Sequence, residues 1–180
     1  MDRIPPIGGD VVDPTRRRPA GYETDAPVAD LTPGELFPLS ALRLWAAPHR
    51  RPDERHPDWR DGFALADLDV DAAAAFEAFM ATLLATASAT LDVRCARCPR
   101  LGADEATFLL AVGHLQRHRP LGATRVLARW MPPAAVRSGL VHLGRFARAA
   151  ADADLWIPSV RIEARRIQEA GIDAGLTRVH

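Results

Sequence analysis

The spacing of apolar residues between Asp71 and Ser88 constrains the fold of this chain more than any other feature. Six apolar side chains recur there at i, i+3, i+4, i+7, i+8 and i+11, namely Phe76, Phe79, Met80, Leu83, Leu84 and Ala87. This series is the apolar face of an amphipathic helix. The apolar residues are rich in alanine and only 6% of all residues are aromatic, which favours helix over strand. We therefore predict an all-α protein.

Prolines and apolar pairs predict two elements before this helix. Thr32 and Glu35 have the spacing of a capping box, but Pro38 would break a helix that begins there. We therefore expect a turn first and then a helix from about Phe37 to Pro48. After a polar connector, one short apolar turn should hold two side chains four positions apart, Trp59 and Phe63.

Three helices are predicted after residue 100. Asp104 is a candidate N-cap for a helix to about Arg119, and a shorter helix should follow up to the prolines at 132 and 133. Pro133 can begin a long final helix. The stretch from Leu110 to Trp130 is similar to one tetratricopeptide helix hairpin in its small and apolar positions, which are Leu110, Ala111, Ala123 and Leu127, with a later Ala135. Because no second copy follows, this similarity implies a helical hairpin and no more.

The 180 residues are enough for one compact helical domain of about five helices. Residues 1–31 are rich in proline and glycine, contain three consecutive arginines and show no helical or strand period, so we predict a disordered arm. We place the helical domain at 32–158. Residues 159–180 should form a C-terminal tail, with a loose helix over Ile162–Ile167. The only extended residues we expect are those at 91–93.

Charge is divided unevenly along a chain whose formal net charge is zero. Residues 61–92 contain five aspartates, one glutamate and no arginine, whereas residues 94–148 contain ten arginines and two acidic residues. The halves either face each other or are solvated, or the second half is a surface for an anionic partner. We predict partner binding by five arginines of the second half: Arg117, Arg119, Arg125, Arg129 and Arg137.

An acidic protein surface is the expected partner of these arginines, and nucleic acid is the alternative. The neutral net charge argues against a nucleic-acid surface, and so does the lack of a stacking platform, since Trp130 and Phe146 beside the arginines are expected to be buried. The chain has no apolar run long enough to span a membrane and no signal peptide at its start. We therefore expect a cytoplasmic protein that binds no membrane.

The two cysteines and two of the histidines have the spacing of a zinc site. Cys95, Cys98, His114 and His118 form a C-x2-C-x15-H-x3-H pattern. In ligand spacing alone, residues 95–118 resemble a C2H2 zinc finger, which implies a zinc-stapled regulator that binds nucleic acid. Gly102 stands where that family has an aromatic residue.

Other interpretations of these four residues stay open. Cys95 and Cys98 are either small buried residues beside a helix start or a redox pair, in which Arg94 and Arg97 would favour the thiolate form. The two histidines are otherwise expected to be exposed surface residues.

No catalytic motif is present. The chain lacks the GxGxxG, P-loop, GxSxG and HExxH patterns, and the acid–base candidates Asp104, Glu105, His114 and His118 are distributed along one predicted helix. We expect no enzyme and no cofactor, zinc excepted. The predicted function is an adaptor or regulatory interaction module that uses an arginine-rich helical surface at 94–148. A zinc-stapled nucleic-acid-binding regulator is the first alternative, and a C-x-x-C thiol redox protein is the second.

Overall fold

The computed structural model describes residues 21–23 and 25–162, and this part of the chain is helical without any β-strand. The prediction of an all-α protein is confirmed. The elements are η1 (Val28–Asp30), α1 (Pro33–Arg50), α2 (Trp59–Leu65), α3 (Val70–Thr86), α4 (Ala103–Gln116), α5 (Pro120–Leu127) and α6 (Pro133–Asp152). One isolated bridge, between Pro27 and Arg100, is the only β-type pairing among these residues.

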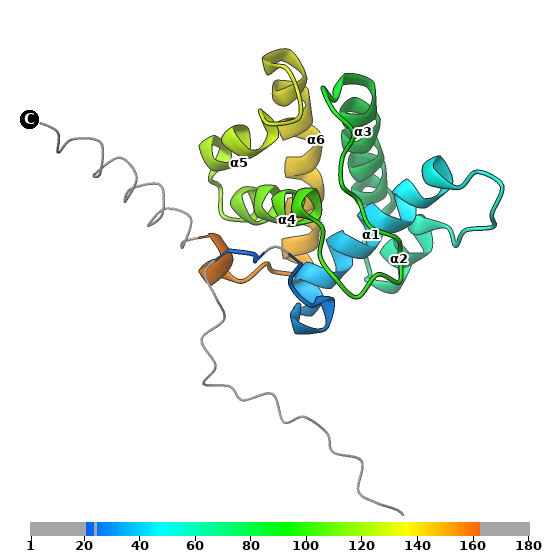
Figure 1. The fold of residues 1–180 in the computed structure, drawn as a ribbon. Helices are drawn as coiled ribbons and strands as arrows, with labels where there is room; N and C mark the ends of the chain where they lie inside the picture. Colours follow the sequence, from blue (N-terminus) through cyan, green and yellow to red (C-terminus); the bar gives the residue numbers. More distant parts are fainter. Residues whose placement is uncertain (1–20, 24, 163–180) are drawn as a thin grey trace, which may run out of the picture.

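Helix α6 is the centre of the fold. It contacts α3, α4 and α5, and Figure 1 shows it between α3 on one side and α5 on the other, with α4 crossing in front. Phe146 of α6 lies in an aromatic cluster, with ring centroids 5.2 Å from Phe76 and 5.8 Å from Phe63. Because α3 and α6 carry alanine at many contact positions, the two helices approach closely and leave their charged residues outside.

Helix α1 begins earlier than predicted. Glu35 accepts hydrogen bonds from the backbone N–H and the hydroxyl of Thr32, at 2.7 and 2.8 Å, and Pro33 occupies the first helical position. Pro38 lies inside the helix, so the expected start at Phe37 is wrong. The missing N–H of Pro38 removes one hydrogen bond, and the cap and the buried face of α1 outweigh that loss. The helix also continues past Pro48 to Arg50.

Helices α2 and α3 agree with the sequence apart from one side chain. Trp59 and Phe63 are buried and their rings make an edge contact at 5.4 Å, as the predicted short apolar turn requires. The carboxylate of Asp69 caps α3 by accepting from the N–H of Ala72 at 2.8 Å. Leu84, which the apolar series assigned to the core, is 60% exposed.

The start of α4 differs from the prediction. Gly102 is the N-cap residue, and the Glu105 carboxylate accepts from its N–H at 2.7 Å. Asp104, the predicted cap, instead accepts from the N–H of Asp92 at 2.7 Å and from Trp130 Nε1 at 2.9 Å. Helices α4 and α5 contact each other as a hairpin, which confirms the predicted helical hairpin.

Residues 21–31, which the sequence placed in a disordered arm, contact the helical domain wherever the structure describes them. The Val28 N–H donates to Pro99 at 2.9 Å, and Ala26 accepts from the Leu101 N–H at 2.9 Å. Leu31 is buried in the core. Residues 1–20 of the predicted arm, and the predicted loose helix except for Ile162, lie outside the described residues. No helix in the described part of the chain combines the length and apolar character needed to cross a membrane.

Candidate functional site

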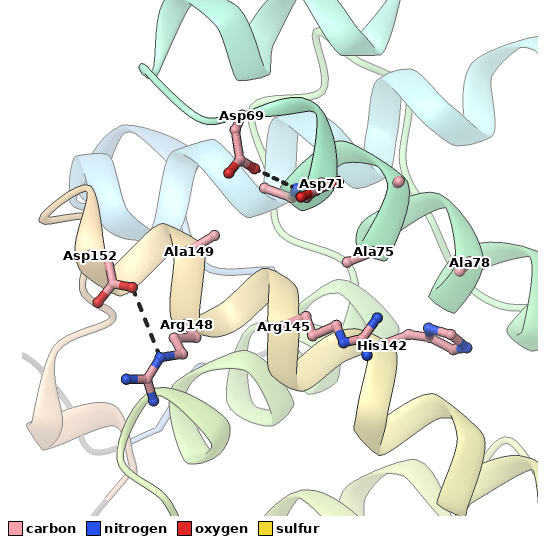
Figure 2. Close-up of a pocket in the computed structure, with 11 residues that line it drawn as sticks. Asp69, Asp71, Ala75, Ala78, His142, Arg145, Arg148, Ala149 and Asp152 are labelled. Carbon is pink, nitrogen blue, oxygen red and sulfur yellow. Dashed lines mark hydrogen bonds and ion pairs between the residues drawn. The ribbon is translucent and has the colours of Figure 1, made fainter.

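A groove of about 540 Å³ lies between α3 and α6 on the surface of the domain. Its α3 wall is built largely from alanine, and Figure 2 shows Ala75 and Ala78 on this wall. The opposite wall carries His142 and Arg145, which Figure 2 shows next to each other on α6. Small side chains on one helix and long cationic ones on the other therefore produce an open, asymmetric groove.

The two ends of the groove differ in charge. Asp69 and Asp71, at the start of α3, lie at one end with Asp152 of α6. Arg148 forms an exposed pair with Asp152, at 4.0 Å between nitrogen and oxygen. Arg145 is exposed and has no ion-pair partner in the described part of the chain. The groove thus presents one unpaired positive charge, that of Arg145, opposite the alanine wall of α3.

The exposed face of α6 continues this positive charge toward the start of the helix. Arg137, Val141, Arg145 and Arg148 follow one another at spacings of four, four and three, so they share one face of the helix. The three arginines are exposed, and Val141 between them is 55% exposed. We call these four residues the α6 basic face.

The structure separates the five arginines predicted to bind a partner into two groups. Arg125, Arg129 and Arg137 are exposed on α5, on the turn after it and on α6. Arg117 and Arg119 are half-buried. The Arg117 guanidinium donates to the carbonyls of Gly113 and Ile157 and lies over the Trp156 ring at 5.9 Å. Arg117 therefore holds the segment after α6 against α4.

The loop that contains the cysteines is fixed by a buried ion pair. Arg43 of α1 forms two hydrogen bonds of 2.8 Å with the Glu105 carboxylate, and their side chains are 3% and 0% exposed. Arg43 also donates to the carbonyls of Cys98 and Arg100, each at 2.8 Å. Glu105 accepts from the Arg94 N–H at 2.8 Å. We call this pair the Arg43–Glu105 clamp.

Within this loop the two cysteines are the ends of one turn. The Cys98 N–H donates to the Cys95 carbonyl at 3.0 Å. Cys95 is exposed and Cys98 is half-buried, and both are free thiols. The interpretation of both as small buried residues therefore does not hold for Cys95.

The two histidines of the predicted zinc set lie near the other end of α4. His118 is exposed and adopts a positive φ of 52° just after the helix. His114 is 9% exposed, so the expectation of an exposed histidine is wrong for it. His114 is buried because Gly122 lies directly against its ring, where a Cβ would overlap the imidazole. No group of three or more His, Cys, Asp or Glu residues among the described positions is arranged to hold a metal ion, and the zinc site stays a prediction.

A second buried ion pair joins the first and last described segments. Arg161 donates to Glu35 at 3.1 Å and to the Gly21 carbonyl at 2.8 Å. Its guanidinium lies 4.9 Å from the centroid of the Tyr22 ring. Burial raises the pKa of the Tyr22 hydroxyl far above its ordinary value, and the negative Glu35 carboxylate raises this pKa further.

His142, Arg145 and Arg148 are the groove residues that the sequence analysis did not single out. A signal for the two arginines exists, because Arg145 and Arg148 are three positions apart on the side of α6 away from the buried Leu143 and Ala147. His142 lies at the edge of that side, four positions before the buried Phe146. The alanines of α3 gave no such signal, since an alanine stripe is equally typical of a buried helix contact.

Comparisons of the chain with protein-family models, with curated proteins and with solved structures each give no match.

Proposed function

We propose that this protein is a non-catalytic interaction module that binds an acidic protein segment along the α6 basic face and the neighbouring groove. One observation carries the proposal. Arg129, Arg137 and Arg145 are exposed on one continuous part of the chain and have no ion-pair partner among the described residues. Exposed charges of one sign raise the rate of encounter with an oppositely charged partner and favour its binding.

The composition of the groove supports a protein partner over a nucleic acid. Val141 and the alanines of α3 provide apolar contact area, which a carboxylate-rich peptide with apolar side chains would cover. Asp69, Asp71 and Asp152 at one end of the groove would repel a partner that is negatively charged along its whole length, such as a phosphate backbone. A peptide can place its acidic side chains near Arg137 and Arg145 and leave that end to uncharged residues. No aromatic side chain lines the groove as a platform for a base.

The groove also supports a non-catalytic role. Asp69 is occupied as the cap of α3, and Asp152 pairs with Arg148. His142 has no hydrogen-bonded carboxylate beside it in the described structure, which a general base of the usual kind would need for its orientation. We propose further that the module acts without a cofactor. We also propose that it acts in the cytoplasm, because free thiols such as those of Cys95 and Cys98 persist in that compartment.

The test is binding of a fluorescently labelled oligo-glutamate peptide to the full chain, measured by anisotropy. The double variant R137E/R145E replaces two attractive charges with two repulsive ones. Its Kd for the peptide should therefore rise by about tenfold or more, which corresponds to about 1.4 kcal/mol or more of binding free energy. The affinity should also fall when the salt concentration is raised from about 0.05 to about 0.2 M, because salt screens the attraction between exposed charges.

The matched control is R51E/R55E, which changes the net charge equally at exposed positions outside the groove. Its affinity for the peptide should stay within about twofold of the parent chain, since neither arginine lines the groove or belongs to the α6 basic face. Equal weakening by both double variants would refute a specific site. Tighter binding of a duplex DNA than of the peptide, with the same sensitivity to R137E/R145E, would replace the acidic protein with nucleic acid.

A further inference from the structure

The turn that carries Cys95 and Cys98 has the geometry of a dithiol that closes to a disulfide. The hydrogen bond from the Cys98 N–H to the Cys95 carbonyl, 3.0 Å long, closes a four-residue turn. In such a turn the first and last Cα atoms lie within about 7 Å of each other. A disulfide needs Cα atoms about 4.4 to 6.8 Å apart, so the Cα separation in this turn is compatible with a disulfide.

The backbone of this turn is held from outside. The Cys98 carbonyl accepts from Arg43 at 2.8 Å, and the neighbouring Pro99 carbonyl accepts from the Val28 N–H at 2.9 Å. On the other side, the Arg94 N–H donates to Glu105. These contacts use main-chain atoms and leave both sulfur atoms available. Because none of these contacts uses a cysteine sulfur, we expect the loop to keep its backbone contacts when the thiols are joined.

The two thiols differ in access, which assigns different roles to them. Cys95 is exposed and Cys98 is half-buried. A disulfide reagent reaches the exposed sulfur first, and the half-buried sulfur is positioned to resolve the resulting adduct.

We propose that Cys95 and Cys98 form a thiol–disulfide exchange site that reacts with low-molecular-weight disulfides, with Cys95 as the attacking thiol and Cys98 as the resolving thiol. The Cys95 thiolate attacks one sulfur of the reagent, whose S–S bond breaks, and the first reagent thiolate leaves and takes up a proton. The Cys98 thiolate then attacks the Cys95 sulfur and displaces the second reagent thiolate. The protein loses two electrons and two protons, and one disulfide becomes two thiols.

This site is independent of the proposed binding function. It lies on the loop before α4 and uses none of the α6 residues. The same two sulfurs are the cysteine half of the predicted zinc set, so metal binding and disulfide exchange make opposing predictions for the purified protein.

The experiment equilibrates the full chain with mixtures of reduced and oxidised glutathione, followed by acid quenching and intact-mass measurement. The parent chain should lose two hydrogens in a single transition, with its far-UV circular dichroism unchanged. Cys98→Ser should accumulate one glutathione adduct on Cys95. In a time course that is quenched before equilibrium, Cys95→Ser should form its adduct at least about tenfold more slowly than Cys98→Ser, because Cys98 is less accessible.

Three results would overturn the proposal. The first is a parent chain that collects glutathione adducts without forming the internal disulfide. The second is equal adduct formation by Cys95→Ser and Cys98→Ser, which would remove the distinction between attacking and resolving thiols. The third is one zinc per freshly purified chain that protects both thiols from glutathione, because the sulfurs would then be metal ligands.

Discussion

Arginine serves opposite purposes on α1 and on α6. On α1, Arg43 is 3% exposed and makes four hydrogen bonds, two to Glu105 and two to backbone carbonyls of the cysteine loop. On α6, Arg137 and Arg145 are exposed and have no ion-pair partner in the described structure. The same side chain is an internal crosslink in the first region and a solvated charge in the second.

A buried carboxylate distinguishes these two kinds of arginine, whereas Arg117 holds the fold through backbone carbonyls. Glu105 and Glu35 are fully buried, and each is paired with an arginine that is 5% exposed or less. A buried charge is tolerated only where a partner and further hydrogen bonds compensate for lost hydration. No such carboxylate faces Arg137 or Arg145, so these side chains stay in water. The number of arginines therefore does not show which of them bind a partner. Whether an arginine is paired distinguishes those that hold the fold from those available to a partner.

The largest effect should follow from breaking the Arg43–Glu105 clamp. Glu105→Ala leaves Arg43 buried without its counter-charge and removes the acceptor of the Arg94 and Gly102 N–H groups. Loss of one partner of a buried pair costs about 3–5 kcal/mol. We expect the free energy of unfolding, measured by urea titration, to fall by at least this amount.

An exposed pair provides the control for this variant. Glu77 accepts from Arg60 at 2.8 Å, and both side chains are 49% exposed. Glu77→Ala should cost about 1 kcal/mol or less, since exposed ion pairs contribute little. Similar losses in Glu105→Ala and Glu77→Ala would contradict the distinction between buried and exposed arginines.

A smaller loss should follow from Arg43→Lys, which keeps the charge and changes the shape. Lysine cannot reproduce the planar fork that reaches both Glu105 oxygens and two carbonyls. Loss of hydrogen bonds to charged groups costs about 1.5–3 kcal/mol. The urea titration should therefore place Arg43→Lys between the parent chain and Glu105→Ala, and a stability equal to that of the parent would show that charge alone matters here.

The sequence predicted the periodic elements of the fold but not the two buried ion pairs. The apolar series of α3 and the proline at the start of α6 are local signals, and both helices begin close to the predicted residues. Arg43 and Glu105 are 62 positions apart, and Glu35 and Arg161 are 126 positions apart. No periodic pattern links residues at such distances, so their pairing emerges only from the packing of the helices.

Two predictions were wrong because contacts between residues distant in the sequence outweigh local signals. Pro38 was given more weight than the Thr32 and Glu35 cap, although the buried pairing of Glu35 with Arg161 stabilises the start of α1. His114 and His118 were expected on the surface because Arg117 and Arg119 lie beside them in the sequence, but Gly122 of the next helix covers the His114 ring. In the candidate site, the basic half of the chain was predicted, whereas the groove required the relative placement of α3 and α6.

The next prediction concerns how the free energy of unfolding changes with pH at Tyr22, which lies beside the buried pair of Glu35 and Arg161. Tyr22 is the only tyrosine in the chain, and its pKa is raised by burial and by the negative charge of Glu35. Above the ordinary tyrosine pKa of about 10, the unfolded chain loses this proton and the folded chain keeps it. The free energy of unfolding should therefore fall as pH rises above about 10, by at most about 1.4 kcal/mol per pH unit.

Absorbance at 295 nm measures this directly, since a single tyrosine contributes to the titration. The folded protein should show no tyrosinate near pH 10, and the signal should appear together with loss of circular dichroism. Tyr22→Phe should remove this part of the alkaline destabilisation. A native protein that titrates near pH 10 with its fold intact would contradict the burial of the Tyr22 hydroxyl.

The smallest effect is expected on α6, where Arg145→Lys is the counterpart of Arg43→Lys. Arg145 makes no ion pair within the described residues, so the free energy of unfolding should change by less than about 0.5 kcal/mol. Because lysine keeps the positive charge, binding of the oligo-glutamate peptide should change by less than about threefold, far less than in R137E/R145E. A loss of stability comparable to that of Arg43→Lys would mean that Arg145 also holds the fold together. A loss of binding with stability intact would mean that the partner reads the guanidinium fork, and bidentate recognition of carboxylates would then define the groove.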